Sequence, residues 1–196
     1  MAKIYVLMGK SSSGKDTIYS ELRKMAELNL KSITMYTTRP MRAGEENGRE
    51  YFFTDEKNVR NLEENNRIIE LRAYNTVHGI WKYFTADDGQ IDKDSDSKYL
   101  IIATLEAYEK YVEYYGNDMI VPIYIEIDDK TRIHRALTRE DSQDEPKYAE
   151  MCRRFLADAA DFSVENLNKA GITRKFVNID MDKCVGEIVL GIRNSL

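Results

Sequence analysis

Residues Gly9 to Lys15 form a glycine-rich segment that reads GKSSSGK. It follows the apolar run Ile4 to Met8, and this order predicts a strand, a tight loop and then a helix. Backbone N–H groups in such a loop can surround a polyphosphate, and the helix N-terminus behind it favours negative charge. The segment therefore predicts a binding site for a nucleoside triphosphate. The residues that we expect to contact it are Gly9, Ser11, Ser12, Ser13, Gly14 and Lys15, followed by Asp16 and Thr17.

The residue after the lysine is Asp16, where this motif usually carries a Ser or Thr that binds Mg²⁺. Thr17 cannot simply take over, because one residue along a helix is a rotation of about 100°. Mg²⁺ accepts carboxylate oxygen, so Asp16 is a candidate metal ligand. The alternative is an acidic residue in the first helical turn, where the helix dipole favours it. Both interpretations stay open from the sequence.

Length and composition restrict the class of protein. The 196 residues suffice for one α/β core with a small insertion. With 29 basic and 34 acidic residues, the net charge of −5 lacks the basic excess of a nucleic-acid-binding protein. Cys152 and Cys184 fit a reducing compartment, and no apolar run is long enough for a signal peptide or a membrane span. We expect a cytoplasmic protein without nucleic-acid or membrane partners.

The spacing of apolar residues places helices and strands around the loop. It predicts helices over 15–28 and from Asp55 to about 65, and a helix that follows strand 99–103 and ends at about 115. Further helices are predicted over 128–139, 147–169 and 182–194. It predicts strands over 50–54, 99–103, 119–127 and 175–179. Alternating strands and helices indicate a parallel sheet covered by helices on both faces. Ligands of such a sheet bind at the carboxyl ends of the strands, where the Gly9 loop lies.

Residues 67–85 show a different, alternating pattern. Ile69, Leu71 and Ala73 fall on one face, with Glu70 and Arg72 on the other. This alternation predicts a small, half-exposed sheet inserted between core elements.

The segment Thr37 to Phe53 reads TTRPMRAGEENGREYFF and closely resembles the nucleoside-monophosphate-binding segment of guanylate kinases. That family carries T-T-R, a second arginine three residues on, G-E, and then a glycine and a tyrosine at these spacings. The resemblance covers most of the chain, including the N-terminal loop, IIEL around Glu70, the arginines after Asp128 and FVNIDMDKCV near the end. It implies one P-loop NTPase-type α/β domain. The expected parts are a core (1–36, 98–128 and 165–196), a small mixed monophosphate-binding insertion (37–86) and a helical lid (129–164).

Arg39 and Arg42 are three residues apart, and two guanidinium forks can hold a phosphate dianion from two sides. Tyr51 can add a hydroxyl donor to the same group. The resemblance implies that these three residues bind the phosphate of GMP. Either arginine alone would also suit a solvated loop.

By the same resemblance, Glu70 accepts two hydrogen bonds from the N1–H and the exocyclic amine of guanine. Adenine offers no such pair of donors, so the site would reject it by leaving a buried charge unpaired. The alternative is a polar residue on the solvent face of an edge strand.

Tyr83 and Thr85 align with family residues that contact the phosphate and guanine. The chain departs from the family because Phe84 replaces a glycine and about three extra residues near Thr76 to His78 precede the motif. We expect His78 to be structural. At the end of strand 99–103 the family places aspartates, whereas this chain reads ATLE, so Thr104 is the candidate guanine ligand there.

The resemblance also assigns arginines to the lid. Arg135 and Arg139 share one helix face, and Arg154 lies on the next helix. They match family arginines that close over the phosphates of ATP, whereas Arg132 and Arg153 fit ordinary salt-bridged helix faces. Asn178 resembles the family residue near adenine. The residues implied in catalysis are Lys15, Arg39, Arg139 and Arg154.

The resemblance implies an enzyme that uses ATP and Mg²⁺ to phosphorylate GMP to GDP, acting as a monomer or homodimer. One alternative is a related P-loop kinase for another nucleoside monophosphate or nucleotide-like phosphate. The other is a non-catalytic module that binds phosphorylated protein segments. Such modules typically lose the phosphate loop, which this chain keeps.

Overall fold

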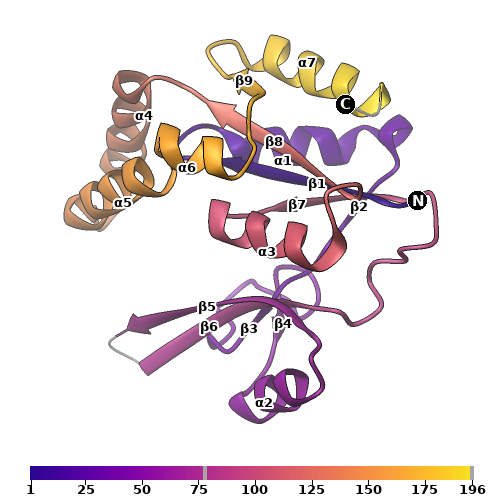
Figure 1. Ribbon diagram of the computed structural model, residues 1–196. Helices are drawn as coiled ribbons and strands as arrows, with labels where there is room; N and C mark the ends of the chain where they lie inside the picture. The colour runs from indigo at the N-terminus through magenta and orange to yellow at the C-terminus, as the bar shows by residue number, and fades with distance from the viewer. Residues whose placement is uncertain (77–78, 195–196) are drawn as a thin grey trace.

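The computed structural model describes residues 1–76 and 79–194. Its core is a parallel sheet with the strand order β2-β7-β1-β8-β9 (Figure 1). The strands are β1 (Lys3–Gly9), β2 (Leu30–Ser32), β7 (Lys98–Ile102), β8 (Ile120–Glu126) and β9 (Lys175–Val177). The N-terminal apolar run forms the middle strand because all of its side chains, from Ile4 to Met8, are fully buried.

The side chains of β1 alternate between two hydrophobic layers. Tyr5 and Leu7 pack in the layer under α1 (Lys15–Lys24) and α7 (Met181–Arg193). Ile4, Val6 and Met8 pack in the layer that α3 (Leu105–Tyr115) and α6 (Val164–Lys169) cover. The expected parallel sheet with helices on both faces is therefore confirmed. No helix in the described part of the chain is long and apolar enough to cross a bilayer.

Local capping sets several helix ends where the sequence predicts them. Asp128 accepts a hydrogen bond from the Thr131 N–H at 2.8 Å and begins α4 (Asp129–Asp141). Asp55 accepts from the Asn58 N–H at 2.8 Å and begins α2 (Glu56–Glu64). The expected helix over 15–28 is shorter. α1 ends at Lys24, and the 3-10 turn η1 (Ala26–Leu28) continues to Asn29.

The expectation of one long helix over 147–169 is wrong. The segment forms α5 (Tyr148–Asp161) and α6, with a break between them. Phe162 is buried at the break, and the Ser163 hydroxyl begins α6 by accepting from the Asn166 N–H at 3.3 Å. Together, α4 and α5 form the helical pair at one end of the molecule (Figure 1).

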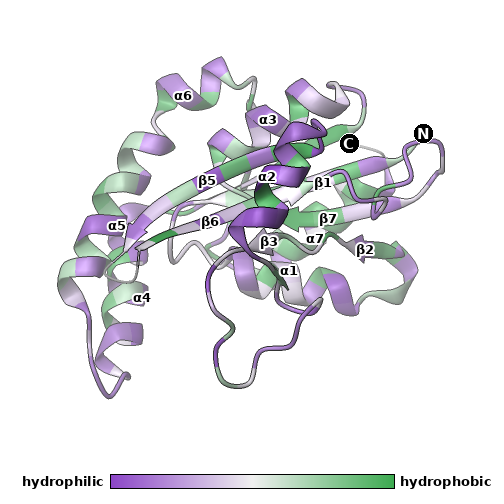
Figure 2. Ribbon diagram, turned by 90° about the horizontal axis from the view of Figure 1, so that it is seen from below, coloured by the Kyte–Doolittle hydropathy of each residue, from purple (hydrophilic) through white to green (hydrophobic). Residues whose placement is uncertain are grey.

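The insertion is a small mixed sheet with the order β4-β3-β6-β5. Its strands are β3 (Tyr36–Thr37), β4 (Phe52–Phe53), β5 (Ile68–Thr76) and β6 (Gly79–Ala86), so the strand expected over 50–54 is only two residues long. The hairpin of β5 and β6 extends along the core toward the end that carries α4 and α5 (Figures 1 and 2).

An irregularity in β5 changes which side chains share a face. The pairing with β6 shifts register between Ile68 and Glu70. Ile69 therefore joins the main core, while Leu71 packs on the other side with Phe84, beside α2. The expected common face for Ile69 and Leu71 is wrong, because a bulge reverses the alternation at this point.

Candidate active site

The phosphate loop joins the end of β1 to the first turn of α1. Ser12 and Gly14 have positive φ angles of 63° and 90°, which turn the chain sharply. The Ser13 N–H donates to the Lys10 carbonyl at 3.1 Å and closes the turn. Lys15 is the first residue of the helix, and its Nζ lies 3.7 Å from the Asp16 carboxylate. The loop thus places the lysine and the helix N-terminus together.

Three buried polar atoms without a partner gather at this loop, namely Ser12 Oγ, Ser13 Oγ and Asn178 Oδ1. In the described residues the other such atom is Tyr115 Oη, at the end of α3. An unpaired buried polar group costs about 1–3 kcal/mol, so a cluster of them is expected where a ligand completes the hydrogen bonds. The two serine hydroxyls can donate to phosphate, and the amide oxygen of Asn178 can accept from an amine such as that of adenine. The loop therefore fits a nucleoside triphosphate.

Asn178 fixes the loop from the opposite side. It lies fully buried just after β9 and donates from Nδ2 to the Ser13 carbonyl at 2.7 Å. A β-carbon added at Gly14 would clash with that Nδ2 atom. Gly14 is therefore required both for its positive φ and for the close approach of Asn178.

We expect Gly14→Ala to abolish measurable ATP binding and to destabilise the protein by about 1–3 kcal/mol, because backbone strain adds to the contact with Asn178. Gly171→Ala is the matched control, since Gly171 has a φ of 72° but no atom within 4 Å of an added β-carbon. Urea denaturation and calorimetric titration with ATP measure the two effects. Equal losses in both variants would show that the contact with Asn178 has no role.

Arg132 ties the loop to the helical pair. Its side chain is 1% exposed and donates to the Ser11 carbonyl at 3.0 Å and to Asp158 at 3.1 Å. The same Asp158 oxygen accepts from the Ser11 N–H at 2.7 Å. The guanidinium also pairs with Asp129 at 2.6 Å and lies 4.4 Å from the ring centroid of Phe155. The interpretation of Arg132 as an ordinary helix-face residue is therefore wrong.

A sequence signal for Arg132 does exist. Arg132, Ala136 and Glu140 are the buried residues of α4, and they are spaced four apart. Their phase marks Arg132 as inward-facing. Asp158, which lies 26 residues further on, carries no such signal.

The arginines expected in the lid have different partners, and one of them is linked to the loop. Arg135 donates to the Asn178 carbonyl at 3.2 Å and is thereby linked to the loop. Arg135 and Arg139 line one open groove along α4, as their spacing predicts. Arg139 and Arg154 are half-exposed and pair locally, with Glu140 at 3.5 Å and Glu150 at 3.4 Å.

A second cluster forms on the insertion around Arg39, which is 4% exposed. Its guanidinium donates to the two carboxylate oxygens of Glu45, at 2.7 and 3.0 Å. The hydrogen bonds from Arg39 hold the pKa of Glu45 below its usual value. The carbonyl of Pro40 takes one further N–H at 2.8 Å, and the Tyr83 side chain is a further partner of the guanidinium.

Two tyrosines complete this cluster. The Arg39 guanidinium lies 5.7 Å from the ring centroid of Tyr51, and the rings of Tyr51 and Tyr83 meet edge to face at 5.6 Å. The structure thus brings Arg39, Tyr51 and Tyr83 together. Arg42 is exposed, and its backbone N–H donates to Glu45 at 2.7 Å.

A third cluster surrounds Glu70, next to the second. In the hairpin, Glu70 pairs with Thr85 and Arg72 with Tyr83, so all four lie on one face. Glu70 is 3% exposed and accepts from Arg72 and from the Thr85 hydroxyl. The alternative of a solvent-facing Glu70 is therefore wrong, although β5 is an edge strand.

Tyr111 of α3 supports this cluster from the core. Its hydroxyl lies 2.6 Å from the Thr85 hydroxyl, whose single hydrogen is donated to Glu70. Tyr111 must then donate to Thr85. Burial, reinforced by the charge of Glu70, raises the pKa of Tyr111, which keeps the phenol protonated.

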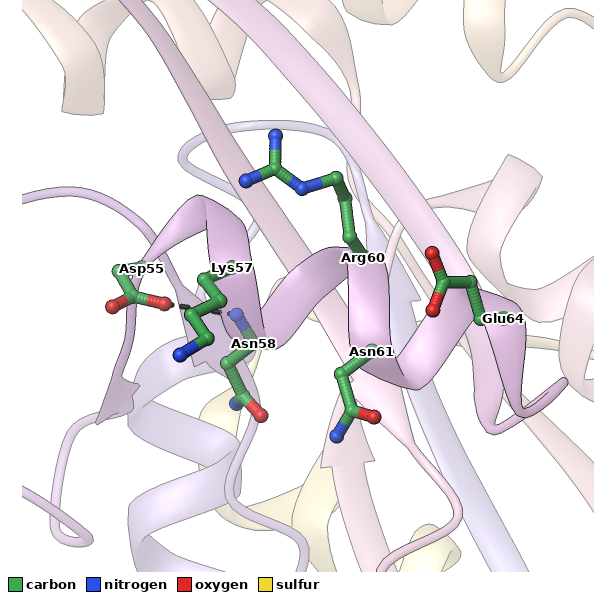
Figure 3. A pocket seen from close by; sticks show the side chains of 6 residues that line it. All are labelled: Asp55, Lys57, Asn58, Arg60, Asn61 and Glu64. Atoms are coloured by element: carbon green, nitrogen blue, oxygen red, sulfur yellow. Dashed lines mark hydrogen bonds between the residues drawn. The ribbon is translucent and has the colours of Figure 1, made fainter.

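A cavity of about 330 Å³ opens beside Arg72 and Tyr74, between β5 and the helices of the core. Thr104 lies on its wall and begins α3 by accepting from the Ala107 N–H at 3.2 Å. The cavity is also lined by Leu105, Glu106, Glu109, Asp161, Asn166 and Lys169. By contrast, the hollow along α2 shown in Figure 3 is lined by Asp55 and residues of that helix alone, and by none of the expected site residues. Val77 and His78 lie outside the described residues.

Asp16 and Thr17 point to different places. The Asp16 side chain is 82% exposed beside Lys15. Thr17 lines a groove between α1 and α7 together with Met181. Within residues 1–76 and 79–194, no group of three or more His, Cys, Asp or Glu side chains could hold a metal. A single carboxylate beside a phosphate loop still fits Mg²⁺, which proteins commonly bind through one or two carboxylates plus substrate phosphates.

Comparisons with known proteins agree with this arrangement. Residues 1–86 match the family model described as guanylate kinase. A guanylate kinase of Mesomycoplasma hyopneumoniae (strain 7448) is 29% identical over 200 residues, covering 96% of this chain and 92% of that protein. One from Wolbachia sp. subsp. Brugia malayi is 37% identical over 82 residues, covering 41% of this chain and 42% of that protein.

A solved structure shows the same fold. The guanylate kinase from Anaplasma phagocytophilum superposes with a TM-score of 0.65 at 20% identity, covering 99% of this chain and 86% of that chain. The chain is thus similar to guanylate kinases in sequence over 96% of its length and in fold over 99%.

Proposed function

We propose that this protein transfers the γ-phosphoryl group of ATP to GMP and forms GDP and ADP. The observation that carries the proposal is that the chain contains two candidate anion-binding sites, which are built from different kinds of residues. The loop of residues 9–15 has unpaired hydroxyl groups and a lysine. The insertion has a buried arginine beside two tyrosines and, next to them, a buried carboxylate.

ATP and GMP would each use one of these sites. The loop amides, Lys15 and the serine hydroxyls would hold the phosphates of ATP, with Arg135 and Asn178 beside them. Arg39, Arg42, Tyr51 and Tyr83 would hold the phosphate of GMP. Glu70, supported by Thr85 and with Thr104 nearby, would read the base.

The chemistry needs no general base, because a phosphate monoester is largely dianionic at neutral pH. A phosphate oxygen of GMP attacks the γ-phosphorus, and the bond from that phosphorus to the bridging oxygen of ADP breaks. The protein contributes alignment of the two phosphates and positive charge around the transferring group. Lys15 and Arg39 supply charge from the two sides, and Arg139 and Arg154 would do so from the lid (129–164). Mg²⁺, when bound, would neutralise charge on the ATP phosphates.

An assay of ADP release with GMP, dGMP, AMP, UMP and CMP as acceptors tests the proposed function. Guanine nucleotides should be strongly preferred. Preference for another acceptor would support the second candidate, a related kinase. The observation that favours it is the segment ATLE after β7, where the family places aspartates. No turnover with any acceptor would contradict both.

The role of Asp16 has its own test. Asp16→Ser should shift the Mg²⁺ concentration that gives half-maximal rate, because a carboxylate ligand is exchanged for a hydroxyl. Asp182→Ser is the matched control, since Asp182 is likewise an acidic residue in the first turn of a helix. It should lose only the helix-dipole contribution of about 0.3–1 kcal/mol and keep the metal dependence. Unchanged Mg²⁺ dependence and turnover in Asp16→Ser would refute the metal role.

A further inference from the structure

The carboxylate of Glu70 is already held by a fork of two N–H donors. Arg72 donates from Nε to Glu70 Oε2 at 3.0 Å and from Nη2 to Glu70 Oε1 at 3.3 Å. Both side chains are withdrawn from solvent, with exposed fractions of 2% for Glu70 and 15% for Arg72. Thr85 supplies only one further donor. Because a buried charge needs partners, Arg72 is the main group that compensates Glu70.

This fork has the same form as the donor edge of guanine. In the Arg72 guanidinium, the Nε–H and Nη2–H project side by side from one carbon atom. In guanine, the N1–H and the exocyclic amine project in the same way from C2. Adenine carries an acceptor at N1 beside its amine and cannot offer this pair. Arg72 therefore makes the hydrogen bonds that the proposed function gives to guanine.

We propose that Arg72 is a specificity-determining residue that competes with the base for Glu70 and yields its place only to a base with two parallel donors. The inference rests on the proposed function, because it requires Glu70 to be the guanine ligand. A base without the two donors cannot replace the bonds that Arg72 would lose. It is therefore rejected before its phosphate is aligned.

The structure also offers a place for the displaced guanidinium. Arg72 lines the cavity of about 330 Å³ beside β5, and the acidic residues Glu106, Glu109 and Asp161 line the same cavity. A rotation of the Arg72 side chain into this space would exchange one carboxylate partner for others. The positive charge would thus stay compensated while Glu70 turns to guanine.

The test compares Arg72→Ala with the wild type in GMP titrations. The KM for GMP should fall about tenfold, because the base no longer displaces a charged, two-donor partner. The kcat should stay within about twofold, since Arg72 touches neither the phosphate loop nor Arg39 in the hydrogen bonds of the structure. A residue with only a structural role would lower kcat or raise KM instead. Unchanged or raised KM in an active variant would overturn the inference.

Methylguanidinium provides a second readout. At millimolar concentration it should inhibit Arg72→Ala competitively against GMP, because it restores the missing fork, and it should leave the wild type unaffected. Methylammonium, which has the charge but no fork, is the control and should not inhibit. Equal effects of methylguanidinium on both proteins would overturn the inference.

Arg72→Lys is the second variant in case Arg72→Ala does not fold, because it keeps a compensating charge and loses the two-donor fork. Its KM for GMP should fall several-fold, and an unchanged KM would overturn the inference. If the wild type turns over GMP and these variants have the same KM for GMP, the inference is refuted and the proposed function is not. A wild type without GMP turnover would refute the proposed function and this inference with it.

Discussion

Replacement of Lys15 by Met is expected to lower kcat/KM for ATP by about 10²–10³-fold, the loss that follows removal of one donor to a developing charge. The Lys15 side chain is only 19% exposed, at the first turn of α1. The fold should be retained, because Lys15 pairs with the exposed Asp16 at 3.7 Å. Initial rates at varied ATP concentration measure the effect, and urea denaturation checks the fold.

Lys24→Met is the matched control for this experiment. Lys24 lies at the other end of α1 and pairs with the exposed Glu21 at 2.7 Å. Exposed pairs of this kind contribute little, so kcat/KM should stay within about threefold of the wild type. Similar rates for Lys15→Met and the wild type would contradict the role of the loop lysine.

Arg132→Met is expected to produce the largest loss of stability, about 3 kcal/mol in the free energy of unfolding. Removal of the guanidinium leaves the Asp158 carboxylate without its charged partner, and the Ser11 carbonyl loses a hydrogen-bond donor. The KM for ATP should rise as well, because Ser11 belongs to the phosphate loop. Urea denaturation and ATP titrations measure the two effects separately.

A double variant distinguishes stability from loop position. Arg132→Met with Asp158→Leu removes both charges and should recover much of the stability, because a buried pair can often be replaced by apolar groups of similar volume. It should not recover the KM for ATP, since neither end of Ser11 is then held. An Arg132→Met protein that unfolds like the wild type would contradict the described contact.

Where structure is decided locally, the sequence predicts it well. Ile4 to Met8 forms the middle strand because its apolar run can be satisfied only by burial on both faces. Asp55 and Asp128 begin helices because each carboxylate reaches a backbone N–H three residues ahead. These features depend on neighbours within a few residues, so the chain alone specifies them.

Features that depend on distant partners are not visible in this way. The break at Phe162 arises because that ring is buried against the core, with Tyr124 stacked at 5.5 Å. The bulge near Ile69 arises from pairing with a strand more than ten residues away. Neither contact can be predicted from helical or alternating periodicity in the sequence.

The residues of the candidate site also fall into these two groups, those that the sequence identifies and those that depend on distant partners. Motif spacing identifies the loop residues, Arg39 and Glu70 as candidates. It does not identify Arg72 as the partner of Glu70, nor Tyr111, which reaches Thr85 across 26 residues of sequence. Side-chain partnerships of this kind follow from the register of the hairpin and its packing on α3.

A bisubstrate compound that joins adenosine to guanosine through five phosphates tests the central claim most directly, namely that the two anion sites hold ATP and GMP together for direct phosphoryl transfer. We predict inhibition that is competitive with both ATP and GMP, and a Kd at least about 100-fold below that of either nucleotide, because linkage makes the second contact intramolecular. Inhibition competitive with only one nucleotide, with the KM of the other unchanged, would contradict the account.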